Sequence, residues 1–323
     1  MLPKVVVIVG TTASGKTGWS LRLAKKFSAR PAASGSARRW ASGNGVEIIS
    51  ADSRQIYKKM DIGTAKEPGE WKRVGLSKIY YIQDIPHHLI GFLDPGKSFT
   101  VSEFKDRANK CVNLIFERGH QPFVAGGTGL YVHALVDNLL IPQIAPNKKL
   151  RRSLEEKDNY ELMQLLKNFD PKGAETVDFN NKRRIVRALE VCLLSGTPFS
   201  EQQKKGEPLY EFLQIGIEVP REELYARIEK RVDNMMKLGL LKEVEDLLKQ
   251  KYSWDLPSLS GIGYSQFKGY FEKQYSLDQT IEFLKRDTRR YAKRQVTWFK
   301  RDPRIKWCKT YEEAEGLVSE FLK

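Results

Sequence analysis

The chain has little of the chemistry that cysteine and histidine supply. Its 323 residues include three cysteines and four histidines. Cys111, Cys192 and Cys308 lie far apart, without Cys-x-x-Cys or Cys/His spacing. This pattern supports neither a disulfide framework nor a zinc site. We interpret the three cysteines as buried thiols.

Long apolar runs are also missing. No apolar stretch approaches the roughly 18 residues of a membrane-spanning helix, and the N-terminus leads into a predicted strand without the features of a signal peptide. We therefore expect a cytoplasmic protein that does not bind a membrane. Apolar residues make up 41% of the chain and charged residues 29%, which is typical of a globular protein with one sizeable core.

Acidic residues are scarce relative to basic ones. There are 55 Lys and Arg against 40 Asp and Glu, a net charge of +15. A surplus of this size favours a polyanionic partner, with nucleic acid first among them. A basic composition can equally serve solubility alone, so a patterned basic patch has to decide between the two interpretations.

Short strands alternate with helices along most of the sequence. Most of the strands are β-branched or apolar runs that end near glycine or polar residues, which is typical of strands in a parallel sheet, whereas 213–219 alternates as a half-buried strand. This alternation predicts an α/β fold, a parallel sheet flanked by helices. The predicted strands are 5–9, 46–50, 122–125 and 213–219, and the helices are 16–27, 101–118 and a long one from Glu222.

Two segments interrupt the alternation. Residues 28–45 are rich in Ser, Ala, Arg and Gly, have no periodicity and exceed the usual length of a loop, so we expect a flexible insertion. Its arginines could instead contact nucleic acid. From 141 to 206 strand signals vanish and amphipathic helices take over. We assign 1–140 and 207–323 to the core and 141–206 to a small inserted all-helical domain.

An eight-residue motif follows the first strand: Gly10-Thr11-Thr12-Ala13-Ser14-Gly15-Lys16-Thr17. It matches G-x-x-x-x-G-K-[ST] and opens a predicted helix, the context that a phosphate loop requires. Backbone N–H groups and the helix N-terminus attract phosphate, Lys16 adds a positive charge, and the Thr17 hydroxyl can bind Mg²⁺. The motif predicts a P-loop NTPase-like core that holds a di- or triphosphate.

Polar residues follow two other strands at the same sheet edge. Asp52 comes just after the second strand, and Gly126-Gly127-Thr128-Gly129 follows the third. Open α/β sheets bind ligands at this edge, so Asp52 and Thr128 should lie near the phosphate loop. Asp52 can hold Mg²⁺ through water, act as a general base or cap the next helix. The glycine cluster can alternatively be a tight turn.

Arg231 is predicted to share an apolar helix face with Leu224, Ile228 and Met235. A charge on such a face needs a partner, either an internal carboxylate or a phosphate in the active site. We favour phosphate, because a phosphate site is already predicted.

Residues 281–300 form an amphipathic helix with a nearly all-basic face. The apolar side holds Ile281, Leu284, Ala292, Val296 and Phe299, and the basic side holds Arg286, Arg289, Arg290, Lys293, Arg294 and Lys300. A basic face of this kind favours contact with RNA or DNA. Arg183, Arg184 and Arg187 form a second basic cluster at helical spacing. Structural ion pairs remain an alternative for both.

Together these motifs resemble the tRNA dimethylallyltransferase (tRNA isopentenyltransferase) family over about residues 4–307. Besides the phosphate loop, the matching stretches are Ala-Asp-Ser-Arg-Gln-Ile-Tyr-Lys from Ala51, Met-Asp-Ile-Gly-Thr-Ala-Lys from Met60, Pro-His-His-Leu-Ile from Pro86, Ala-Gly-Gly-Thr-Gly-Leu-Tyr from Ala125, Arg-Arg-Ile-Val-Arg-Ala-Leu-Glu from Arg183, Ile-Gly-Tyr from Ile262 and Ala-Lys-Arg-Gln-Val-Thr-Trp-Phe from Ala292.

The resemblance implies transfer of a dimethylallyl group from dimethylallyl diphosphate to N6 of the adenosine 3′ of the anticodon in tRNA. It implies Mg²⁺ as cofactor, the anticodon stem-loop as partner, and Asp52, Lys16, Thr128 and Arg231 as catalytic residues. We expect a monomer. The residues then expected to contact tRNA are Asp52, Ser53, Arg54, Gln55, Thr128, Arg151, Arg183, Arg184, Arg187, Gly261, Gly263, Tyr264, Arg290 and Arg294.

Two features depart from the family pattern. The 28–45 insertion has no counterpart that we recognise, and Gly91 stands where an acidic residue is expected. The chain ends at Lys323 without the C-terminal zinc finger of eukaryotic relatives, so we expect the bacterial type. The alternative function is a P-loop kinase of a nucleotide or small metabolite, in which Asp52 would activate a hydroxyl. That alternative explains the loop but not the basic helix. A nucleic-acid-binding NTPase without prenyl chemistry is a further rival.

Overall fold

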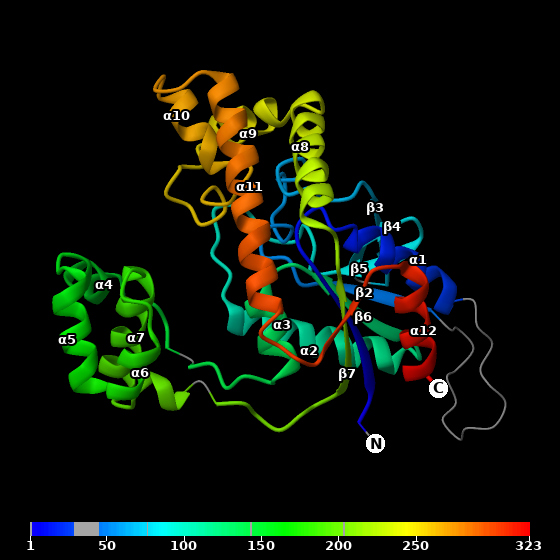
Figure 1. Cartoon of the computed structure of the whole chain (residues 1–323), viewed down its shortest axis with the longest axis horizontal. Coiled ribbons are helices and arrows are strands. Elements are labelled where there is room, and N and C mark those ends of the chain that lie inside the picture. Colours follow the sequence, from blue (N-terminus) through cyan, green and yellow to red (C-terminus); the bar gives the residue numbers. More distant parts are fainter. Residues whose placement is uncertain (1, 29–44, 76, 143, 203) are drawn as a thin grey trace. The chain divides into compact units, whose positions relative to one another are not determined.

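A computed structural model describes residues 2–28, 45–75, 77–142, 144–202 and 204–323 (Figure 1). Of the predicted insertion, Ser28 ends a helix and Gly45 precedes a strand. The rest of the insertion lies outside the described residues. By backbone contacts the chain divides into two compact units, Met1–Leu135 with Leu209–Lys323, and Val136–Pro208.

The larger unit is built on an eight-stranded sheet with the order β3-β4-β5-β2-β6-β1-β7-β8. The pairs from β5 to β8 are parallel, and β1, β2 and β6 are buried along most of their length, as their apolar sequences predict. The strands are β1 (Lys4–Val9), β2 (Val46–Ser50), β3 (Glu70–Val74), β4 (Ser77–Ile82), β5 (Ile85–His88), β6 (Gln121–Gly126), β7 (Glu211–Ile217) and β8 (Ile305–Cys308).

The α/β class is therefore as predicted, but the sheet is mixed. β4 runs antiparallel to both β3 and β5, so a three-stranded antiparallel extension adds to the parallel strands. Tight connections suit antiparallel pairs, whereas parallel neighbours need a crossover. The connections from β3 to β4 and from β4 to β5 are both short, and the second is a turn at 83–84.

Helices cover the sheet. α1 (Lys16–Ser28) and α12 (Tyr311–Phe321) contribute Leu23, Phe27 and Val318 to one apolar cluster with the strands. α2 (Val101–Glu117) and α3 (Gly129–Val136) pack together through the stacked rings of Phe104 and Tyr131, whose centroids lie 4.0 Å apart.

A second apolar cluster joins the remaining helices of the larger unit to the segment after β2. Val232, Leu247, Phe267 and Leu284 belong to it, together with Met60. The elements are α8 (Arg221–Lys237), α9 (Leu240–Lys249), η2 (Ser265–Phe267), α10 (Lys268–Phe271) and α11 (Leu277–Phe299), and in Figure 1 they extend beyond the sheet edge. This cluster brings α8 and α11 to the side of the sheet where the phosphate loop lies.

Helices are the regular elements of the smaller unit within its described residues. It contains α4 (Lys148–Glu155), α5 (Asn159–Phe169), α6 (Pro171–Thr176), α7 (Lys182–Ser195) and η1 (Phe199–Gln202). Leu162, Leu166, Ile185 and Leu189 form its core and are fully buried. Asp158 caps α5 with a capping box, and Asn181 caps α7, so the sequence specifies where these helices begin.

The cysteines are free thiols. Cys192 and Cys308 are buried as predicted, whereas Cys111 is only half-buried. Within the described ranges there is no cluster of three or more His, Cys, Asp or Glu side chains arranged to bind a metal ion. None of the described helices is both long enough and apolar enough to cross a membrane.

Candidate active site

The phosphate loop connects β1 to α1 in a conformation suited to binding an anion. Ala13 and Gly15 have φ angles of 61° and 94°, in the left-handed region, which turns successive N–H groups toward the same side. Among the described residues, the N–H groups of Gly15, Lys16 and Thr17 have no hydrogen-bond partner. These donors lie at the N-terminus of α1, where the helix dipole favours negative charge.

Ser14 adds a further unsatisfied polar group to the loop. Its side chain is 2% exposed, and its Oγ has no hydrogen-bond partner among the described residues. A buried hydroxyl without a partner is rare in folded proteins, and Ser14 does not line the cavity that its neighbours in the loop form.

Two cations lie at the loop. The Lys16 ammonium donates to the Thr11 carbonyl at 2.5 Å, and Arg231 Nη1 donates to the Thr12 hydroxyl at 3.3 Å. Burial lowers the pKa of Lys16 to about 8, Asp52 opposes this shift, and Arg231 adds to it. Burial also lowers the pKa of Arg231. Neighbouring buried cations repel each other, so a bound anion would relieve an unfavourable arrangement.

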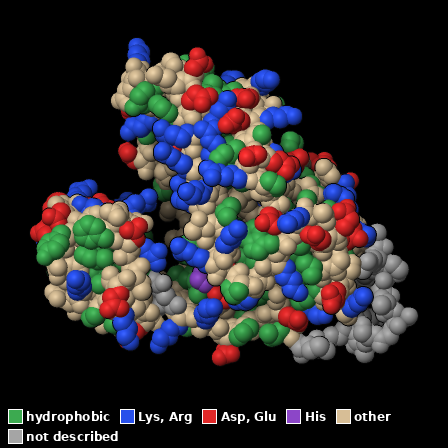
Figure 2. All heavy atoms as spheres, in the orientation of Figure 1, with side chains coloured by type: hydrophobic (Ala, Val, Ile, Leu, Met, Phe, Trp, Pro, Cys, Tyr) green, Lys and Arg blue, Asp and Glu red, His purple; other side chains and the backbone are tan. Residues whose placement is uncertain are grey.

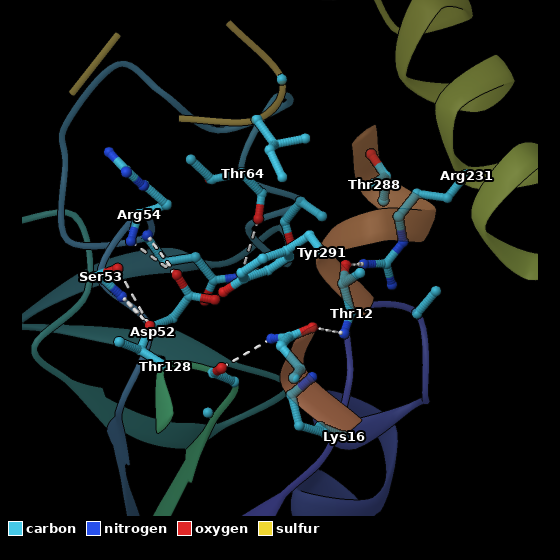
Figure 3. Close-up of a pocket in the computed structure, with 18 of the residues that line it drawn as sticks. Thr12, Lys16, Asp52, Ser53, Arg54, Thr64, Thr128, Arg231, Thr288 and Tyr291 are labelled. Carbon is cyan, nitrogen blue, oxygen red and sulfur yellow. Dashed lines mark hydrogen bonds between the residues drawn. The ribbon is translucent and has the colours of Figure 1, made fainter. Parts of the chain in front are cut away.

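Arg231 lies on the buried face of α8 with Leu224, Ile228 and Val232, close to what the helical periodicity predicts. No carboxylate of the described residues is within ion-pair distance of it. The sequence left two possible partners for Arg231, an internal carboxylate or a phosphate. The carboxylate is therefore excluded among the described residues. Arg231 points into the cavity instead (Figure 3).

Asp52 and Thr128 come from the ends of neighbouring strands. Asp52 Oδ1 accepts hydrogen bonds from the N–H groups of Arg54 and Gln55, at 2.8 and 3.3 Å. Thr128 Oγ1 accepts from the Ser53 N–H at 2.9 Å. The segment after Asp52 forms turns and no helix begins there, so the helix-cap alternative is wrong and the carboxylate orders a turn instead.

These side chains line one cavity of about 700 Å³. In Figure 3, Asp52, Ser53, Arg54 and Thr128 lie on one side, and Thr12 and Arg231 lie on the other, with Lys16 below. The site therefore places a carboxylate opposite a cationic phosphate loop.

Tyr291 of α11 lies between the two sides of the cavity in Figure 3. Burial, reinforced by Asp52, raises its pKa to about 12. The phenol is therefore neutral at physiological pH and is not the base of this site.

Gln295, which was not predicted as a site residue, bridges the two loops of the site. Its side chain is 6% exposed. Its Oε1 accepts from the Thr12 N–H at 2.8 Å, and its Nε2 donates to the Gly127 carbonyl at 2.8 Å. Gln295 lies three residues after Ala292 and four before Phe299, on the buried side of α11. A polar residue on an apolar helix face is the signal from which Arg231 was predicted, and the same signal could have identified Gln295.

Some of the residues expected to contact tRNA line the cavity, and others do not. Ser53, Arg54, Gln55, Gly263 and Arg294 line the cavity. Gly261 is beside Arg54, because a Cβ built there would be 3.1 Å from the arginine side chain. Tyr264 is buried, and its hydroxyl donates to Glu243 at 2.7 Å.

The departure at Gly91 concerns a turn near this segment. Gly91 has a φ of 57°, a conformation that favours glycine, and its N–H donates to the Gln55 carbonyl at 2.8 Å.

Basic side chains gather over α11, as Figure 2 shows. Part of this face is neutralised, since Arg289 pairs with Glu229 at 2.7 Å, and Asp287 lies 3.0 Å from Arg286 and 3.8 Å from Arg290. Lys293, Arg294 and Lys300 are exposed and have no acidic partner among the described residues. The face therefore combines ion pairs with free cations, of which Arg294 lines the cavity, and is less purely basic than the sequence suggested.

In the smaller unit, the basic cluster is also divided. Arg151 makes a two-pronged contact with the buried Glu190, at 2.8 and 2.6 Å, and Arg187 adds a third contact at 2.6 Å. The ion-pair alternative therefore describes these two arginines. Arg183 and Arg184 are exposed on the first turn of α7.

Comparisons with known proteins agree with one another. A family model described as IPP transferase matches residues 55–302. A tRNA dimethylallyltransferase of Acetivibrio thermocellus is 43% identical, covering 100% of this chain and 97% of the relative. One of Roseiflexus sp. is 42% identical, covering 94% and 92%.

Solved structures give the same picture. The tRNA isopentenylpyrophosphate transferase of Bacillus halodurans is 35% identical, with a TM-score of 0.67, covering 99% of this chain and 96% of that one. A eukaryotic dimethylallyltransferase acting on tRNA is 26% identical, with a TM-score of 0.73 and coverage of 98% and 77%.

Proposed function

The chain belongs to the IPP transferase family, and on this premise we propose that it transfers a dimethylallyl group from dimethylallyl diphosphate to N6 of the adenosine 3′ of the anticodon in tRNA. The observation that carries the proposal is a cavity in which a cationic phosphate loop faces Asp52. No observation favours the P-loop kinase. The proposal includes dimethylallyl diphosphate as the donor and Mg²⁺ as the cofactor. It also includes action as a monomer in the cytoplasm.

The diphosphate would bind the free N–H groups of Gly15, Lys16 and Thr17, with Lys16 and Arg231 on its oxygens. When the allylic C1–O bond breaks, negative charge grows on the departing diphosphate. Donors and cations that are already in position stabilise that charge without reorganising. Leaving-group stabilisation is essential here, because the exocyclic amine of adenine is a weak nucleophile and C1 must develop carbocation character before attack.

Mg²⁺ fits the residues at this loop. It binds few protein ligands and keeps waters and phosphate oxygens in its shell, so the Thr17 hydroxyl, which lines the cavity, and Asp52 through water suffice to hold it. When bound, the ion would neutralise diphosphate charge.

Asp52 would accept the proton from N6. As the N6–C1 bond forms, the nitrogen becomes positively charged and its proton acidic, and a nearby carboxylate can remove it. The turn N–H groups of Arg54 and Gln55 fix the direction of that carboxylate. Thr128 positions the same turn, because its Oγ1 accepts from the Ser53 N–H and its hydroxyl donates to Ser53 Oγ at 3.2 Å. A bound diphosphate oxygen would compete for that hydroxyl proton.

The transferred group is an apolar five-carbon chain, and the cavity has an apolar part to match. Val232 and Met235 of α8, Leu284 of α11 and Ile262 line it. Burying such a chain contributes about 0.8 kcal/mol per methylene, and an apolar wall keeps water from an allylic cation. These residues support a prenyl diphosphate over a nucleotide as the ligand.

The target adenine must leave its stack to enter the cavity, at a cost of a few kcal/mol. Contacts to the RNA backbone can offset that cost. We propose that Arg294 and Lys293 of α11 and Lys300 just after it make such contacts, and that Arg183 and Arg184 make them on the smaller unit.

The function is tested by incubating the protein with radiolabelled dimethylallyl diphosphate, Mg²⁺ and unmodified tRNA, then digesting the tRNA to nucleosides. We expect label in N6-dimethylallyladenosine from the position 3′ of the anticodon. A parallel reaction with labelled ATP tests the kinase alternative. Phosphate transfer from ATP without tRNA-dependent use of the prenyl donor would overturn the proposal.

A further inference from the structure

Gln295 bridges the phosphate loop and the loop that follows β6. Its carboxamide spans from Thr12 to Gly127 with two hydrogen bonds of 2.8 Å. The bond partners fix the orientation, since Thr12 N–H can only donate and the Gly127 carbonyl can only accept. The side chain also fills the space between the two loops, because a Cβ built on Gly127 would lie 2.5 Å from Gln295 Nε2.

The donors of the loop are therefore of two kinds. Thr12 N–H is already bonded to a buried protein side chain, and the Thr12 hydroxyl receives Arg231. The N–H groups without a partner among the described residues include that of Ala13, next to Thr12, and those of Gly15, Lys16 and Thr17 at the start of α1. Loops of this type that bind nucleoside triphosphates cradle the outer phosphates as well, with backbone groups and the lysine. Here Gln295 occupies the Thr12 N–H and the space beside it.

We propose that Gln295 is a specificity-determining residue that limits the loop to ligands with two phosphates and excludes nucleoside triphosphates. This inference rests on the proposed function only in taking a diphosphate as the ligand. It explains how a loop with the usual Lys-Thr ending avoids ATP in a cell: a third phosphate would have to displace a carboxamide that makes two buried hydrogen bonds. Displacement would leave Thr12 N–H and the Gly127 carbonyl to find new partners, and the carbonyl would face a phosphate oxygen, which cannot donate.

The test is calorimetric titration of the full chain with pyrophosphate and with tripolyphosphate, both in Mg²⁺ buffer. For the wild type we expect pyrophosphate to bind at least about tenfold more tightly, the factor that one hydrogen bond involving a charged group contributes. Gln295→Ala removes the carboxamide and frees Thr12 N–H. We expect it to strengthen tripolyphosphate binding and bring the ratio of the two affinities close to one.

Gln214→Ala is the matched control. Gln214 is a buried glutamine of β7 that bonds Asp302 at 3.3 Å and does not line the cavity, so its loss should leave the affinity ratio at the wild-type value. Thermal melts report whether each variant is folded. Gln295→Glu serves if the alanine variant does not fold. Its carboxylate would repel the longer anion more strongly, and the ratio should rise.

Equal affinity of the wild type for both anions, or a ratio that neither Gln295 variant changes, would overturn the inference. Neither result depends on prenyl transfer, because the titration contains no tRNA and no prenyl group. Conversely, failure of the labelling reaction would leave the measured preference for two phosphates intact. The two proposals can therefore fail separately.

Discussion

Binding of a diphosphate to this protein should weaken above about pH 8. Burial lowers the pKa of Lys16 from its ordinary 10.5 to about 8 in the free protein, so the ammonium loses its proton over a range in which an ordinary lysine keeps it. Once bound, a diphosphate restores the charged form, because anions raise the pKa of a neighbouring amine. Affinity that depends on this proton should fall about tenfold per pH unit above 8.

Titration with pyrophosphate between pH 6.5 and 9.5 measures this directly. Two neighbours set the sign of further shifts, since Arg231 lowers the pKa of Lys16 and Asp52 raises it. The decline should therefore move to higher pH in Arg231→Gln and to lower pH in Asp52→Asn. Lys16→Arg is the control, because a guanidinium stays charged throughout this range. Any pH dependence that remains with Lys16→Arg belongs to pyrophosphate itself.

A wild-type affinity that follows the Lys16→Arg curve up to pH 9.5 would refute the reasoning. So would a decline that moves in the same direction in both neighbour variants, because the two side chains carry opposite charge.

Three further predictions concern single side chains. Asp52→Ala should lower single-turnover prenylation at least about 100-fold, the usual contribution of general base catalysis, with little change in tRNA affinity by filter binding, and near wild-type turnover would remove the base assignment. Arg231→Ala should lower kcat/KM for the prenyl donor about tenfold or more, and an unaltered value would return the arginine to a structural role. Glu47→Gln should lower the free energy of unfolding at pH 7 by about 3 kcal/mol in urea denaturation, because Glu47 is buried and paired with Arg118 and two histidines. Burial raises the pKa of Glu47, but hydrogen bonds from His88 and Arg118 outweigh it and bring it to about 2. This contribution is therefore present above pH 4.5 and lost as the pH falls toward 2, and wild-type and variant curves that stay parallel in acid would contradict it.

The sequence predicts the centre of the sheet well because those strands are apolar on both faces. β1, β2, β6 and β7 were placed within two residues of their observed bounds. β3 was missed because its residues Glu70–Val74 are almost all exposed, so neither an apolar run nor alternation marks it. β8 has four residues, too few for a periodic pattern.

The residues of the candidate site were also predicted only in part. Lys16 was predicted from a motif, Asp52 and Thr128 from strand ends, and Arg231 from an apolar helix face. The structure brings all four to one cavity. Gln295 was missed because it belongs to the site through tertiary contacts with residues 283 and 168 positions away. Helical periodicity alone shows that it is buried, but not which loops it joins.

The arrangement of strands has a last consequence for the chemistry. β1 and β2 both pair with β6, and in both pairs the residue opposite is Ala125, which faces Ile8 on one side and Ser50 on the other. Gly10 and Asp52 each come two residues later, so the start of the phosphate loop and the carboxylate leave the sheet at the same height. Their lateral separation is two strand spacings, about 10 Å. The pairing of the strands thus sets the distance between the start of the phosphate loop and the residue that carries the proton-accepting carboxylate. Side-chain substitutions in the loops can change what binds but not this main-chain distance.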